Sequence, residues 1–198
     1  MDVLEIIKRS KRVLDHYHIP ALTHKEWLLL LQFSQLRSIK KGDYFIKAGQ
    51  TCHQLAFVVR GCFRFYYIKN EVEKTAYFTF ENDVLASFEC ILLNQPSAQS
   101  IQALEDSEVF VMDYNQMRKI YETNHRFEHL GRIIGEHYIL MLHNRLSSYL
   151  LDTPEERYLT LVNETPDFLH RVPLQHIASF IGVTPVSLSR IRKRILKK

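Results

Sequence analysis

The stretch of sequence that decides the fold is LQHIASFIGVTPVSLSRI, residues 174–191. Its first half places Ile177, Ala178 and Ile181 on one face of a helix. Gly182 follows at the position where a left-handed residue ends a helix at the lowest cost. Because Ala178 is small, a second helix can cross the first with the two backbones close together. This half predicts a short helix followed by a tight turn.

The second half of the stretch predicts another helix that packs on the first. Thr184 is a good N-cap, and Pro185 fits the first helical turn, where its missing N–H costs nothing. Leu188 and Ile191 then form an apolar stripe that faces the first helix. A generic helical hairpin needs amphipathic helices but not this Ala, this Gly and this spacing together. The combination favours a helix-turn-helix unit.

Charge on the outward face separates a DNA-binding unit from a plain hairpin. That face is polar or cationic, with Ser187, Ser189, Arg190, Arg192, Lys193, Arg194, Lys197 and Lys198. Residues 168–198 hold seven Lys or Arg and no acid, whereas residues 1–167 hold 19 basic and 22 acidic residues, a charge of −3. Solvated helix faces usually mix both signs. The segregated positive charge predicts binding to the phosphates of nucleic acid.

Length and composition bound the class of protein. A chain of 198 residues has room for one large domain or two small ones. Cys52, Cys62 and Cys90 are odd in number and widely spaced, so neither a disulfide framework nor a cysteine-based metal site is supported, and no metal or cofactor is predicted. The sequence shows neither a membrane-spanning apolar run nor a signal peptide, so we expect a cytoplasmic protein without a membrane partner.

Strands dominate the first half of the chain after two N-terminal helices. Apolar residues at helical spacing predict a helix over the first 17 residues, and Thr23 with Glu26 forms a capping box for a second. Short segments rich in aromatic and β-branched residues follow: LAFVVRG, CFRFYYIK, TAYFTF, SIQAL and EVFVMD. They favour a sandwich or barrel, so residues 1–113 are predicted to form a sensor domain.

A long helical stretch follows, over residues 114–151, and is predicted to be a dimerisation helix. Its apolar stripe comprises Phe127, Leu130, Ile133, Ile134, Tyr138, Met141, Leu142, Leu146 and Leu150. The β domain alone could bury this stripe, but its length over about seven turns favours pairing with a second copy. The predicted interface residues are Phe127, Leu130, Ile134, His137 and Met141. His137 is interpreted as an interfacial hydrogen-bonding residue, with a pH or ligand contact as the alternative.

Residues 152–198 are predicted to form a separate helical domain. Asp152 or Thr153 can cap its first helix, and Pro154 fits the first turn. The chain ends soon after Lys193, so a β-hairpin wing after the second helix of the helix-turn-helix is expected to be short or absent.

This order of elements resembles the Crp/Fnr, or catabolite-activator-type, family of bacterial transcription regulators. The resemblance rests on KKGDYFIKAGQ, FVVRGCFRFYY, PSAQSIQALEDSEV, TPEERYLTLV and IASFIGVTPVSLSRIRK, and it covers nearly the whole chain. It implies an α+β protein with a β-barrel (a double-stranded β-helix like that of cyclic-nucleotide-binding domains), a long dimerisation helix and a C-terminal, winged helix-turn-helix domain. It also implies a homodimer on near-palindromic double-stranded DNA that works with RNA polymerase.

This chain departs from the family members that bind cyclic AMP at the residues that hold that ligand. Family members that bind cyclic AMP have a Gly-Glu pair where this chain has Ala86-Ser87, or Phe88-Glu89 if the loop slips, and an Arg where it has Ser97. No Lys or Arg occurs between Glu81 and Val111, so a buried phosphate would lack its charge-assisted partner. We therefore expect a different, unidentified small-molecule effector, in a pocket predicted to be lined by Phe88, Glu89, Ser97, Gln99 and Tyr138.

Metal-based sensing is not favoured either. The oxygen-sensing relatives hold an iron–sulfur centre on an N-terminal cysteine cluster, but this chain has no cysteine before Cys52. A haem sensor would need axial ligands such as His53 or His137, and a lone histidine is more often a surface or packing residue.

The predicted function is therefore sequence-specific DNA binding in transcription regulation. Predicted DNA-contacting residues are Thr184, Pro185, Val186, Ser187, Ser189, Arg190, Lys193 and Arg194. The resemblance matches Arg190 to an arginine that reads bases in the major groove, whereas Pro185 and Val186 depart from the pattern of the cyclic-AMP-binding members. An alternative is a ligand-binding regulatory module that acts on a protein partner. An enzyme is not expected, because residues 55–113 contain no histidine to join a metal site and no catalytic motif appears.

Overall fold

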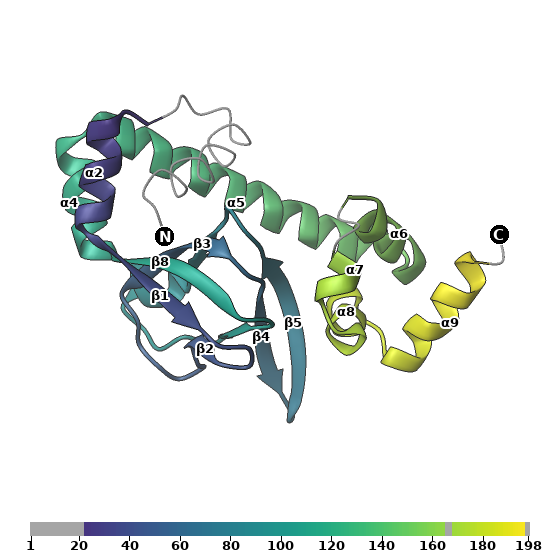
Figure 1. Cartoon of the computed structure of the whole chain (residues 1–198). Coiled ribbons are helices and arrows are strands. Elements are labelled where there is room, and N and C mark those ends of the chain that lie inside the picture. Colours follow the sequence, from purple (N-terminus) through teal and green to yellow (C-terminus); the bar gives the residue numbers. More distant parts are fainter. Residues whose placement is uncertain (1–21, 165–167, 197–198) are drawn as a thin grey trace.

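The computed structural model describes residues 22–164 and 168–196 of the chain (Figure 1). The helix predicted for the first 17 residues lies outside these ranges, as do Lys197 and Lys198. The first described helix, α2 (His24–Gln32), begins as predicted: the Thr23 hydroxyl accepts a hydrogen bond from the Glu26 N–H, and the Glu26 carboxylate accepts one from the Thr23 N–H. Its capping box is therefore confirmed.

Two four-stranded antiparallel sheets form the body of the sensor domain. The strands of the first sheet are, in order, β1 (Ser34–Ile39), β8 (Ser107–Asp113), β3 (Gln54–Arg60) and β6 (Val84–Ala86). Those of the second are β2 (Tyr44–Ile46), β7 (Ser100–Ala103), β4 (Phe63–Lys69) and β5 (Val72–Thr79). The five predicted strand segments are all present, and the expected barrel is a sandwich of two sheets. Sequence patterns did not reveal β1, β2 and β6, two of which have only three residues.

The core of the sandwich lies between the inner faces of the two sheets. Its fully buried side chains come from both sheets and include Val58, Phe63, Phe65, Leu85, Ile101 and Val109. Buried and less buried side chains alternate along β5 and β8, as expected for strands with one face on the core, whereas the first four residues of β4 are all buried.

The helices after the sandwich differ in one respect from the predicted long stretch. Residues 114–151 form two helices, α4 (Tyr114–Thr123) and α5 (His125–Leu151), instead of one. The break lies at Asn124, whose backbone is extended and whose side chain accepts a hydrogen bond from the N–H of Arg126. Asparagine is one of the residues preferred at helix N-caps, so a new helix begins directly after it. A short helix between β6 and β7, α3 (Phe88–Leu93), was not predicted at all.

Helix α5 crosses the sandwich and leads into the C-terminal helices (Figure 1). These are α6 (Pro154–Glu164), α7 (Phe168–Arg171), α8 (Leu174–Ile181) and α9 (Pro185–Ile195). Thr153 caps α6, because its hydroxyl accepts a hydrogen bond from the N–H of Glu156. After α9, no strand follows within the described residues. Among the helices described, none is long and apolar enough to cross a membrane.

The C-terminal helices dock directly on the outer edge of the sandwich. We call this contact the interdomain seam; it joins β5 and its neighbouring loops to α7 and α8. Phe78 of β5 packs against Phe168 and Phe180, with ring centroids 4.9 and 5.4 Å away. Buried residues of both domains, including Cys62 and Ile177, belong to the same hydrophobic cluster. The two domains therefore share one core at this seam.

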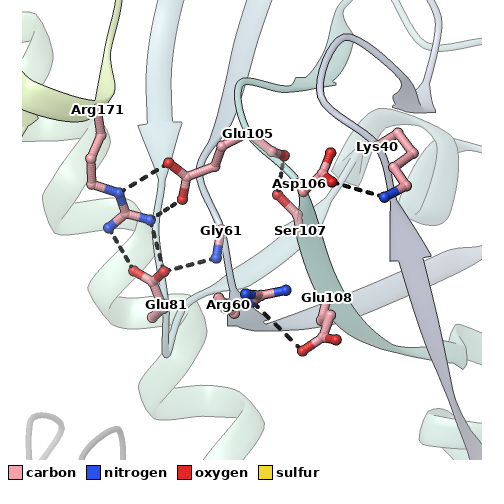
Figure 2. A network of polar contacts seen from close by, with 9 residues as sticks. All are labelled: Lys40, Arg60, Gly61, Glu81, Glu105, Asp106, Ser107, Glu108 and Arg171. Carbon is pink, nitrogen blue, oxygen red and sulfur yellow. Dashed lines mark hydrogen bonds and ion pairs between the residues drawn. The ribbon is translucent and has the colours of Figure 1, made fainter.

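An arginine at the end of α7 adds a polar clamp to the seam (Figure 2). The Arg171 guanidinium donates hydrogen bonds to both carboxylate oxygens of Glu81, at 2.7 and 2.8 Å, and also to Glu105. The backbone N–H of Gly61 donates to the same Glu81 carboxylate at 2.8 Å. Arg171 and these hydrogen bonds hold the pKa of Glu81 below its usual value, against the effect of burial, which raises it. Bidentate geometry and partial burial make this clamp stronger than an exposed ion pair.

We expect Arg171→Gln to weaken the seam measurably. The substitution leaves the carboxylates of Glu81 and Glu105 close together without a cation, so the free energy of unfolding should fall by about 1–3 kcal/mol. Scanning calorimetry and urea titration would measure it. The control is Lys40→Gln, which removes the exposed Lys40–Asp106 ion pair seen in the same network (Figure 2). Equal losses in the two variants would contradict a special role for Arg171.

His176 makes the seam sensitive to acid. Burial and the nearby Arg64 lower the pKa of His176 to about 4, although Glu73 acts in the opposite direction. The folded protein therefore binds fewer protons than the unfolded chain between pH 6.5 and 4, and stability must fall as the pH falls through that range. Above pH 6.5 the histidine is neutral in both states and costs nothing.

We expect the free energy of unfolding to decrease from pH 6.5 to pH 4, and His176→Gln to flatten this part of the profile. His170→Gln, at an exposed position on α7, is the matched control. Denaturant titrations at several pH values would give both profiles. If His176→Gln and the wild type lost stability in parallel, protonation of His176 would not be the cause.

Candidate DNA-recognition helix and effector pocket

The geometry between α8 and α9 confirms the predicted helix-turn-helix. Gly182 ends α8 with φ 80° and ψ 29°, in the left-handed region, and the N–H of Val183 donates to the carbonyl of Ala178 at 2.9 Å. The Thr184 hydroxyl then accepts a hydrogen bond from the N–H of Ser187 at 3.2 Å, and Pro185 occupies the first turn of α9. Each local signal in the sequence thus has its expected structural role.

The packing of α8 against α9 determines which face of α9 is exposed. Ala178, Ile181 and Leu188 are fully buried between α8 and α9, and Ile191 is nearly so. The opposite face of α9 is exposed, and α9 projects away from the sandwich at the far end of the molecule (Figure 1). Exposed positions on α9 include Pro185, Val186, Arg190, Arg192 and Lys193.

Four of the predicted DNA-contacting side chains are already engaged within the protein. The hydroxyls of Ser187 and Thr184 lie 3.0 Å apart, and the Ser189 hydroxyl donates to the carbonyl of Pro185 at 3.0 Å. Arg194 forms an ion pair with Glu155 of α6. Arg190 and Lys193, by contrast, are exposed and make no ion pair with a described residue. They are the cations of the predicted set that are most available.

The second half of α5 carries many exposed apolar side chains. These are Ile139, Leu140, Leu142, Leu146, Tyr149, Leu150 and Leu151. Ile139 and Leu146 are 66% and 61% exposed. Large apolar side chains that gather on an exposed surface often mark a site of contact with another molecule. These exposed side chains begin near the C-terminal end of the predicted interface and extend beyond it to Leu151.

The structure corrects part of the predicted dimer interface. Phe127 is completely buried in its own chain, in a cluster with Trp27 and Met117, so it has no surface to offer a partner. Met141 packs against the core of its own sandwich. Leu130 and Ile134 are half-buried and His137 is exposed. When α5 packs on α4 and the sandwich, one side of the apolar stripe is buried within the same chain. The periodicity of the sequence alone could not reveal which side this is.

A cavity of about 480 Å³ lies between the second sheet, α3 and α5. Its walls are formed by Tyr67, Lys74, Thr75, Ala76, Tyr77, Phe88, Glu89, Gln99, Tyr138, Leu142, Arg145 and Tyr149. Four of the five predicted pocket residues are among them. The hydroxyls of Tyr77 and Tyr138 lie 3.2 Å apart and connect β5 to α5 across the cavity. Burial raises the pKa of Tyr77 well above its usual value, so these phenols are neutral.

Ser97, the fifth predicted pocket residue, does not line the cavity. Its hydroxyl lies 2.8 Å from that of Ser87 and donates to the carbonyl of Gln99 at 2.7 Å. Ser97 is also only 2% exposed. It braces the loop between α3 and β7 instead of facing a ligand.

Arg145 is the main residue of the pocket that the sequence interpretation missed. Its guanidinium donates hydrogen bonds to the carbonyl of Ala76 on β5, at 3.2 Å, and to the carbonyl of Phe180 on α8. It also stacks on the rings of Phe180 and Tyr149, with centroid distances of 3.6 and 4.3 Å. Burial lowers the pKa of Arg145 to about 10. The available signal was an arginine one turn after Met141, on a face of the helix that is otherwise apolar.

Residues 36–124 match the family model of the cyclic nucleotide-binding domain. No curated protein sequence matches the chain significantly. Among solved structures, the chain is similar to FixK2 from Bradyrhizobium japonicum, at 15% identity and a TM-score of 0.71, over 83% of this chain and 85% of that chain. It is also similar to the c-di-GMP-responsive global regulator CLP of Xanthomonas campestris, at 13% identity and a TM-score of 0.70, over 88% and 92%.

A third similar structure is a protein of Eubacterium rectale assigned to the Crp/Fnr family of transcriptional regulators. It shares 16% identity and a TM-score of 0.69, over 88% of this chain and 84% of that chain. Identities this low establish the fold alone, and the matches cover most of the chain. The chain thus contains a cyclic nucleotide-binding-type domain and has the overall fold of the Crp/Fnr regulators.

Proposed function

We propose that this protein is a sequence-specific DNA-binding transcription regulator. The observation that carries the proposal is α9: an exposed helix without any acidic residue, held away from the sandwich by a helix-turn-helix packing. DNA presents dense negative charge, and a cationic helix of this kind fits the major groove. Similarity to the global regulator CLP, which links signalling to virulence gene expression, supports the same class of function.

Within α9, the residues divide into base-reading and phosphate-binding groups. Arg190 is exposed near the middle of the helix, where a planar guanidinium can engage guanine O6 and N7 together. Val186 is 62% exposed and is placed to contact a thymine methyl group. Lys193 lies one turn further along, where phosphates would be met. Arg194 is better explained as a structural residue, because Glu155 already neutralises it.

We expect Arg190→Ala to weaken binding to the cognate operator by about 1–3 kcal/mol and to leave binding to random DNA nearly unchanged. Lys193→Ala should weaken both and reduce the salt slope by about one. The operator is obtained by selection of bound fragments from genomic DNA, and affinities are measured by fluorescence anisotropy at several salt concentrations.

Glu155→Gln serves as the control for folding of the helix-turn-helix, because it breaks the Arg194 ion pair without changing α9 itself. Equal losses on cognate and random DNA for Arg190→Ala would contradict its base-reading role. Failure of the wild type to retain any genomic fragment would favour the alternative function, a ligand-binding module that acts on a protein partner.

A homodimer through the second half of α5 belongs to the same proposal. Two copies of the exposed row from Ile139 to Leu150 would bury each other's apolar surface, as in a coiled coil. Dimerisation would also place two α9 helices on one duplex, which a near-palindromic operator requires.

We expect Leu146→Glu to produce monomers and to weaken operator binding by at least about tenfold, because the dimer doubles the DNA contacts. Since Leu146 is 61% exposed, the charge does not disturb the core of its own chain. Arg132→Glu, at an exposed polar position on the same helix, is the control. Sedimentation velocity would measure the assembly state, and a monomeric wild type at micromolar concentration would refute the dimer.

The effector that we propose for the sandwich differs from cyclic AMP. One observation supports this: Ser97, which stands where the cyclic-AMP-binding relatives have an arginine, is buried in its own loop hydrogen bonds. In addition, the segment between Glu81 and Val111 has no cation to neutralise a cyclic phosphate. An anionic ligand of this pocket must therefore pair with a cationic side chain from outside this segment.

A further inference from the structure

The pocket beside α5 has the size and the walls of a small-molecule site. A cavity of about 480 Å³ falls within the usual range for bound organic molecules, roughly 300–1,000 Å³. Tyr67, Tyr77, Phe88, Tyr138 and Tyr149 supply aromatic surface, which favours a flat or ring-containing ligand. Phe88 and Tyr138 already contact each other, with ring centroids 4.9 Å apart.

Charge in the pocket is unbalanced toward the positive side. Arg145 and Lys74 line the cavity, whereas Glu89 is the one acidic residue among its lining side chains. The Glu89 carboxylate accepts a hydrogen bond from the N–H of Ala98 at 3.0 Å and forms no ion pair with a described residue. Arg145 likewise has no carboxylate partner in the described part of the chain and relies on two backbone carbonyls. A half-buried guanidinium without a counter-ion attracts an anion.

One buried acceptor in the same cavity lacks a donor. The side-chain oxygen of Gln99 is buried and has no hydrogen-bond partner among the described residues, although Gln99 itself is only 4% exposed. Leaving such an acceptor unpaired costs about 1–3 kcal/mol. A ligand that carries a hydroxyl or a ring N–H would satisfy it.

We propose that this pocket binds a small aromatic monocarboxylate, whose carboxylate pairs with Arg145 and whose hydroxyl or ring N–H donates to Gln99. A single carboxylate fits better than a phosphate ester, because two donors of Arg145 already serve the carbonyls of Ala76 and Phe180 and leave one edge of the fork. This inference specifies the effector of the regulator described above and so rests on that proposed function.

Arg145 also connects the pocket to the helix-turn-helix. The same guanidinium bonds to the carbonyl of Phe180 and stacks on its ring, and the Tyr149 hydroxyl donates to that carbonyl at 2.9 Å. A carboxylate that pairs with the free edge of Arg145 is held by the same guanidinium as the Phe180 carbonyl at the end of α8. Binding of the acid is thereby coupled to the docking of α8 on β5 and to the position of α9.

The test compares each acid with its neutral amide on the wild-type protein. The probes are 4-hydroxybenzoate, 4-hydroxycinnamate and indole-3-acetate, each paired with the corresponding primary amide, and cyclic AMP is included as a further ligand. Calorimetry should show that at least one acid binds, at least about tenfold more tightly than its amide, because only the acid forms a charge-assisted pair. Cyclic AMP should bind more weakly than that acid.

Variants then locate the bound acid. Arg145→Gln should lower its affinity by at least about tenfold and make acid and amide equivalent. Gln99→Leu should reduce the preference for the hydroxylated or N–H-bearing ring over benzoate. Arg157→Gln is the matched control: it removes a neighbouring arginine that also bonds to backbone carbonyls but does not line the cavity. It should keep the affinity of the wild type.

The outcomes separate this inference from the proposed function. No binding by any of the acids, or equal affinities for acid and amide, overturns the inference, even if the wild type still shifts its selected operator. If the wild-type protein binds the acid but binds no DNA operator, the proposed function is overturned instead. If the acid binds without changing operator affinity by more than about twofold, the coupling through Arg145 is wrong.

Discussion

The interdomain seam is the contact on which the rest of this structure depends. Phe78 and Phe180 meet there, and residues of both domains share one hydrophobic cluster, so each domain covers part of the apolar surface of the other. Arg171 reinforces this apolar contact with two carboxylates of the sandwich. The consequence is positional: once α7 and α8 are fixed on β5, packing between α8 and α9 determines where α9 points.

Helix α5 serves three purposes because its faces meet different surroundings. One face packs on α4 and the sandwich through Phe127, Tyr138 and Met141. Another leaves Ile139 and Leu146 exposed, and this is the surface that we propose for a second copy. Near its end, Arg145 and Tyr149 reach the carbonyl of Phe180 and so contact the helix-turn-helix. A rigid helix of this length physically connects the pocket with the proposed dimer surface and the proposed DNA-binding unit.

Local sequence signals determined the parts of the structure that depend on neighbouring residues. Gly182, Thr184 and Pro185 specify a turn and a helix start because their backbone preferences act over a few residues. Thr23 and Glu26 cap α2 for the same reason. The alternating strand segments and the segregated positive charge of the last 31 residues could also be predicted, since both are properties of the chain before it folds. These signals were sufficient for the fold class and for the exposed face of α9.

Long-range packing decided the rest. Phe127 and Leu146 belong to the same apolar stripe in the sequence, yet one is buried in its own chain and the other is exposed, because only the folded α4 and sandwich cover one side of α5. Ser97 is buried in hydrogen bonds of its own loop, whereas Arg145, almost fifty residues further along the chain, is one of the cations that line the pocket. The sequence by itself determined which helices form and what charge they carry. Only the tertiary structure decided which side chains face a ligand, a partner or the core, because that choice depends on surfaces brought together from distant parts of the chain.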